Sequence, residues 1–93
     1  MMEKQKIKKI VVYLLSKNIK KAALFGSFVR EDFGPKSDID ILIEPFPGMT
    51  LVDIIYMESE LKLKTQRKID LMEFDGIRKS VRPFVFDQAL SII

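Results

Sequence analysis

The chain has 93 residues and a formal net charge of +3, and it contains neither cysteine nor histidine. These absences exclude disulfides, thiolate zinc sites and histidine general bases, so any catalysis must use carboxylates, hydroxyls, amines or a hard cation such as Mg²⁺ held by oxygen. With 47% hydrophobic and 31% charged residues, residues 1–93 have the balance of one small globular domain, and a charge of +3 does not by itself indicate nucleic-acid binding.

The start of the chain predicts an amphipathic helix over residues 2–18. Asn18 is a plausible end for it. Lysines fill one side, which we interpret as a solvated face, with a patch for an acidic partner or an RNA as the alternative. We find no signal peptide and no membrane-spanning stretch, so a cytoplasmic location is expected. Apolar residues recur on the other side at helical spacing: Ile7, Ile10, Val11, Leu14 and Leu15.

The first predicted strand covers residues 22–25, an apolar run without alternation that is typical of a strand buried on both faces. Gly26-Ser27 ends this strand, and residues 27–32 can begin a short helix that Phe33-Gly34-Pro35 breaks.

The second predicted strand covers residues 37–43, along which side chains alternate between the two faces. Asp38, Asp40 and Leu42 share one face. The other face predicts a core, because it carries three isoleucines: Ile39, Ile41 and Ile43.

A loop over residues 44–48 leads to a second predicted helix that begins with a capping box at Thr50 and Asp53 and ends near Lys64. We expect one side of this helix to carry Leu51, Ile54, Ile55, Glu58 and Leu61.

The third predicted strand covers residues 67–74, with Ile69 and Leu71 on one face and Lys68, Asp70, Met72 and Phe74 on the other. A turn at Asp75-Gly76, one helical turn over residues 77–81 and a last helix from Pro83 follow. Alternating helices and strands predict an α/β (α+β) domain, with a small mixed sheet of three or more strands flanked by helices. The last helix offers Phe84, Phe86, Ala89, Leu90 and Ile93 for packing.

Asp38 and Asp40 stand at i and i+2 on one strand face, where two bare carboxylates would repel each other. A divalent cation removes this conflict, and two cations about 4 Å apart can be bridged by such a pair. Asp70, in the middle of another apolar strand, is the candidate third ligand, since an unpaired charge there would be costly. Taken alone, these aspartates can also be a turn cap and exposed strand residues.

Gly26 and Ser27 stand between a strand and a helix start, where free backbone N–H groups offer an anion site. The Ser27 hydroxyl and Arg30, one turn later, could reach phosphate oxygens. The alternative is that Ser27 is only a helix cap and Arg30 only a surface cation.

These motifs together resemble the minimal nucleotidyltransferases (MNT proteins) of the DNA polymerase beta-like nucleotidyltransferase superfamily. The resemblance covers nearly the whole chain and implies the nucleotidyltransferase fold. It implies that Asp38, Asp40 and Asp70 bind Mg²⁺, with two ions expected, and that Gly26, Ser27 and Arg30 handle the phosphates of ATP. One departure is Glu31, where a glycine commonly follows the arginine.

The resemblance also implies a partner. Many MNT proteins are antitoxins of toxin–antitoxin pairs and transfer AMP from ATP to a tyrosine of an all-helical HEPN ribonuclease. The alternatives are a catalytically idle module that neutralises a partner by contact, and an RNA-directed nucleotidyltransferase that uses the lysine-rich first helix. We do not expect direct nucleic-acid binding, and assembly with itself or with a partner stays open.

Overall fold

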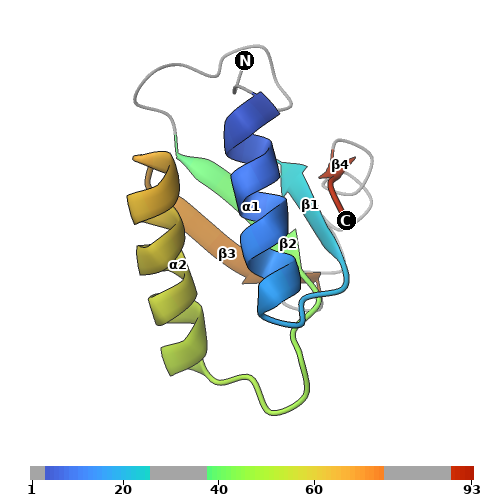
Figure 1. Cartoon of the computed structure of the whole chain (residues 1–93). Coiled ribbons are helices and arrows are strands. Elements are labelled where there is room, and N and C mark those ends of the chain that lie inside the picture. The colour runs from blue at the N-terminus through green and yellow to red at the C-terminus, as the bar shows by residue number, and fades with distance from the viewer. Residues whose placement is uncertain (1–3, 26–37, 75–88) are drawn as a thin grey trace.

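The computed structural model describes residues 4–25, 38–74 and 89–93. In that part of the chain, helices α1 and α2 lie side by side on one face of a mixed four-stranded sheet (Figure 1). The predicted α/β architecture is therefore confirmed. The elements run in the order α1 (Lys4–Ser16), β1 (Ala22–Phe25), β2 (Ile39–Ile43), α2 (Leu51–Thr65), β3 (Ile69–Glu73) and β4 (Leu90–Ser91).

The strands lie in the order β3-β2-β1-β4. β1 pairs antiparallel with both of its neighbours, whereas β2 and β3 are parallel. A parallel pair needs a crossover connection, and α2 supplies it. This β2–α2–β3 unit brings the starts of two aspartate-bearing strands to the same end of the sheet.

Alternation along β2 and β3 gives the sheet its helix-facing core, as predicted. This core joins residues of both helices to the strand residues Ile39, Ile41, Ile43, Ile69 and Leu71. The central strand β1 is buried at Ala22, Ala23 and Leu24, which confirms its interpretation as a strand covered on both faces.

Helix α1 ends where the sequence indicates. Asn18 adopts a left-handed conformation with φ of 63°. The Ile19 N–H donates to the Leu14 carbonyl at 3.0 Å, and the Asn18 N–H donates to the Leu15 carbonyl at 3.1 Å, which is the Schellman pattern of a helix end. The prediction of which residues form the apolar stripe of α1 was wrong at one position. Leu15 is 53% exposed, while Tyr13 is buried beside Ile10 and Leu14, so the buried stripe is rotated toward Tyr13.

Helix α2 begins with the predicted capping box, in which Thr50 and Asp53 each bond the backbone N–H of the other. The prediction of which side of α2 is buried was wrong in part. Met57, Leu61 and Thr65 are buried at i, i+4 and i+8, whereas Leu51 is 71% and Ile55 52% exposed. Because apolar residues occur nearly all round this helix, packing on the sheet and on α1 chooses the buried side.

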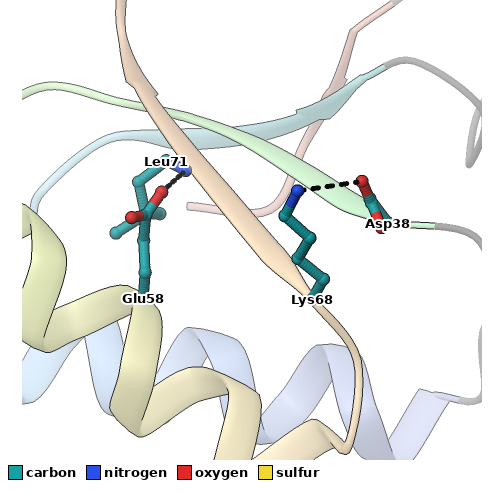
Figure 2. Close-up of polar contacts among 4 residues, drawn as sticks. All are labelled: Asp38, Glu58, Lys68 and Leu71. Atoms are coloured by element: carbon teal, nitrogen blue, oxygen red, sulfur yellow. Dashed lines mark hydrogen bonds and ion pairs between the residues drawn. The ribbon is translucent and has the colours of Figure 1, made fainter.

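Glu58 of α2 reaches the sheet edge. Its carboxylate accepts a hydrogen bond of 2.9 Å from the Leu71 N–H of β3 (Figure 2). β3 ends the described sheet, so this N–H has no neighbouring strand to pair with. The carboxylate satisfies a donor that would otherwise stay open on an edge strand.

The end of the chain departs from the predicted last helix. Leu90–Ser91 form strand β4 beside β1, and the N–H groups of Ile92 and Ile93 both donate to the Ala22 carbonyl. An extended conformation here gives the open edge of β1 its hydrogen-bond partners, which a helix could not do. Four predictions about local structure lie outside the described residues: the short helix over 27–32, the turn at 75–76, the helical turn over 77–81 and residues 83–88 of the last helix.

Across the described ranges, no helix is both long and apolar enough to cross a membrane.

Candidate active site

The sheet register places Asp40 beside Asp70. Asp40 of β2 is the direct Cα partner of Asp70 in parallel strand β3, and on its other side it pairs with Phe25, the last residue of β1. Partners in register point to the same face of a sheet, and neighbouring strands lie about 4.8 Å apart. The sequence predicts that these two aspartates meet, and the register brings them together.

The two aspartates lie on the face of the sheet opposite the helices. Their strand neighbours Ile39, Ile41 and Leu71 point into the helix-facing core, so Asp40 and Asp70 point the other way. Both are half-buried rather than sealed in the interior. Carboxylates in this setting remain reachable by an ion or a ligand while the strand backbone holds them rigidly.

Asp38 comes one residue before β2 and contacts a different group. Its Oδ2 lies 3.9 Å from the Nζ of Lys68, at the approach to β3 (Figure 2). A backbone hydrogen bond of 2.9 Å from the Ile39 N–H to the Lys68 carbonyl joins the two segments beside this ion pair. Both side chains are well exposed, so the pair contributes little stability.

The predicted three-aspartate metal site is only partly assembled. Within the ranges 4–25, 38–74 and 89–93, no three Asp, Glu, His or Cys side chains converge to hold a metal ion. Asp40 and Asp70 are adjacent by register, and the Asp38 carboxylate lies 3.9 Å from the ammonium group of Lys68. The all-oxygen donor set suits a hard divalent cation, and a third ligand would require Asp38 to turn from Lys68.

The predicted phosphate-binding residues Gly26, Ser27 and Arg30 lie outside the described residues. Their chain position still bears on the site, because Gly26 directly follows Phe25, and Phe25 is the register partner of Asp40. The segment proposed to hold phosphates therefore leaves the sheet next to the aspartate pair.

Sequence reasoning did not assign Lys68 to the site. The available signal was its spacing, since Lys68 and Asp70 are at i and i+2 of an extended segment and therefore share a face. What the spacing could not reveal is the parallel pairing that brings the approach to β3 beside Asp38.

Comparison with known proteins identifies the family. The family profile described as "Nucleotidyltransferase domain" matches residues 4–92. The chain belongs to this nucleotidyltransferase family. A Methanocaldococcus jannaschii protein named as a protein adenylyltransferase is 29% identical over 86 residues, which cover 92% of each chain. The sequence-based expectation of a nucleotidyltransferase enzyme is confirmed.

Solved structures share the fold of this nucleotidyltransferase. A chain of a toxin–antitoxin complex with AMP-PNP superposes with a TM-score of 0.81 at 19% identity, over 94% of this chain and 72% of that one. A chain from a complex of a tri-AMPylated Shewanella oneidensis HEPN toxin with its MNT antitoxin gives 0.77 at 18% identity, over 99% and 72%. At these identities the two matches establish a common fold.

Proposed function

We propose that this nucleotidyltransferase transfers AMP from ATP to a hydroxyl group of a partner protein, and that it acts as the antitoxin of a HEPN-type toxin. The observation that carries the proposal is the Asp40–Asp70 pair, held in register at the strand end next to Gly26-Ser27. Two adjacent carboxylates beside a candidate phosphate-binding segment are what metal-assisted phosphoryl transfer requires.

In this proposal Asp38, Asp40 and Asp70 hold Mg²⁺, and Gly26, Ser27 and Arg30 hold the triphosphate of ATP. Bound Mg²⁺ would neutralise charge on the phosphate oxygens and on the leaving pyrophosphate. Asp70 accepts the proton of the acceptor hydroxyl. The freed oxygen bonds to the α-phosphorus as the bond from that phosphorus to the bridging oxygen breaks, and pyrophosphate departs with the electron pair.

Several observations support a protein as the acceptor. The relative from Methanocaldococcus jannaschii is named for adenylyl transfer to protein. One structural neighbour is an MNT antitoxin in complex with a tri-AMPylated HEPN toxin, and another complex contains AMP-PNP. A tyrosine of a HEPN-type protein is accordingly the acceptor that we propose, with ATP as donor.

The test is to incubate the chain with Mg²⁺, ATP and the HEPN-type protein encoded beside it, and to weigh that protein by mass spectrometry. We expect added AMP on a tyrosine peptide, abolished by EDTA and by Asp40→Ala. Glu44→Ala, which removes an exposed carboxylate just beyond the other end of β2, is the matched control and should leave transfer unchanged. Absence of adduct with the parent chain, despite complex formation, would refute the proposal.

The second candidate is a contact-only inhibitor, and one observation favours it: Asp38 pairs with Lys68 at 3.9 Å, and no three carboxylates converge in the described residues. In that case the chain would block the HEPN-type ribonuclease equally well with or without ATP. Asp40→Ala separates the two, because a contact inhibitor keeps its inhibition in this variant and an AMP-transferring enzyme loses it.

A further inference from the structure

A groove of about 510 Å³ runs along the outer side of α1, beside the last turn of α2. Its lining includes Lys8, Lys9 and Val12, which are exposed, whereas Ile10 and Leu14 on the inner side of α1 are fully buried. The two helices cover one face of the sheet (Figure 1), and Asp40 and Asp70 lie on the other face. The groove is therefore separate from the candidate active site.

Tyr13 lines this groove with a buried hydroxyl. The residue is 6% exposed, and no described atom is in hydrogen-bonding geometry with its Oη. Burial first, and then the nearby Glu60 carboxylate, raise the pKa of the phenol above its usual value.

The charged residues among the described lining of the groove are all lysines, and one carboxylate, that of Glu60, lies close to Tyr13. Lys8, Lys9 and Lys64 line it, and the described lining residues include no carboxylate. The ammonium groups of Lys17 and Lys64 lie 5.7 and 5.8 Å from the centroid of the Tyr13 ring. Three lysines that share a groove repel one another, and a ligand with carboxylates would relieve this repulsion.

The groove also has an apolar wall. Val12 lines it and is 58% exposed. Water-exposed aliphatic side chains next to lysines favour a ligand that carries both apolar and acidic groups.

We propose that this groove binds a segment of a partner protein that bears acidic and aliphatic side chains, with carboxylates at Lys8, Lys9 and Lys64 and an aliphatic side chain on Val12. This docking proposal rests on the proposed function in one respect: it takes the bound partner to be the protein that accepts AMP. A partner held on the helix layer would stay bound while its hydroxyl reaches the aspartates at the end of the sheet.

RNA fits the groove less well. Single-stranded nucleic acid needs exposed aromatic faces for base stacking and a continuous cationic track. The only aromatic ring among the described lining residues, that of Tyr13, is buried. An aliphatic side chain would pack against Val12 better than a nucleic-acid base would.

The test measures binding of four fluorescently labelled probes to the purified chain by fluorescence anisotropy. Three probes are peptides of about twelve residues: one of glutamate with leucine, one of glutamate with serine, and one of lysine with leucine. The fourth is a uridine oligonucleotide of about twelve nucleotides. The glutamate–leucine peptide should bind most tightly, and its affinity should fall as salt rises. Combined Lys8→Glu, Lys9→Glu and Lys64→Glu should weaken it by about tenfold or more.

The matched control reverses three exposed lysines outside the groove, Lys4, Lys20 and Lys62, and should bind the glutamate–leucine peptide within about twofold of the parent. Asp40→Ala should bind it like the parent, so failure of docking and failure of AMP transfer are distinguishable. The proposal is overturned if the glutamate–leucine peptide binds no better than the other peptides, if both triple variants behave alike, or if the oligonucleotide is the probe whose binding depends on Lys8, Lys9 and Lys64.

Discussion

The two faces of β2 and β3 follow the same alternation but differ in what they contact. On the helix side, Ile39, Ile41 and Leu71 are almost entirely buried and join both helices to the sheet. On the opposite side the same strands present Asp40 and Asp70 in register, both half-buried. The helix side therefore joins the helices to the strands and fixes their positions, and the other side, where Leu42 is also buried, keeps two like charges adjacent.

The largest expected effect lies on the aspartate face. Asp70→Asn should lower AMP transfer on the order of 1,000-fold, since a metal ion stabilises the transition state by several kcal/mol. The melting temperature should change little, because the carboxylate contributes to the site and not to the core. Glu73→Gln removes the same charge from the same strand on the other face and is the control. Equal activity in the two variants would show that Asp70 has no special role.

The next effect lies on the helix side. Ile41→Ala removes a fully buried side chain from the centre of the core and should lower the free energy of unfolding by about 2–5 kcal/mol. Met72→Ala, on the aspartate face and 41% exposed, should cost about 1 kcal/mol or less. Urea denaturation measures both. A similar cost for the two would mean that the faces do not differ in their contribution to folding.

A smaller effect is expected at the edge of β3. Glu58→Ala leaves the Leu71 N–H without its acceptor and should cost about 1.5–3 kcal/mol. Glu58→Gln keeps an acceptor oxygen and should recover part of this loss. Hydrogen exchange at the Leu71 amide is the sharper readout, since exchange should accelerate in the alanine variant and much less in the glutamine variant. Unchanged protection in both would mean that the hydrogen bond does not hold the edge.

The smallest effect concerns Lys68. The ion pair with Asp38 is exposed and worth roughly 1 kcal/mol or less, so Lys68→Ala should leave the stability almost unchanged. Removal of the competing ammonium group should lower the Mg²⁺ concentration needed for half-maximal transfer by about two- to fivefold. Lys62→Ala is the control. A higher Mg²⁺ requirement would instead assign Lys68 to nucleotide binding.

Short-range patterns in the sequence predicted the local structure well. Thr50 and Asp53 form the expected capping box, and Asn18 ends α1 in a left-handed conformation. The isoleucines of β2 face the core as the alternation predicts. Each of these features depends on residues within a few positions of one another, so their identities and spacing are sufficient. The roles of Gly26, Ser27 and Arg30, which rest on the same kind of motif, stay predictions.

Long-range features were decided by the tertiary structure. Met57 and Leu61 are buried instead of Leu51 and Ile55, because α2 is apolar on more than one side and only its neighbours select the side that faces inward. The end of the chain became β4 because the edge of β1 needed hydrogen-bond partners, a requirement that residues 89–93 do not display by themselves.

The aspartates combine both kinds of information. The sequence alone predicted that Asp40 and Asp70 point away from the isoleucine-rich core faces of their strands, since alternation fixes the face of each residue. Only the parallel pairing of β2 and β3 decided that Asp40 lies directly beside Asp70 while Asp38 meets Lys68. Alternation excludes a shift of one residue in that register, which would turn Asp70 toward the helices. A shift of two residues would keep every side chain on its face and separate Asp40 from Asp70, and only the tertiary structure excludes it.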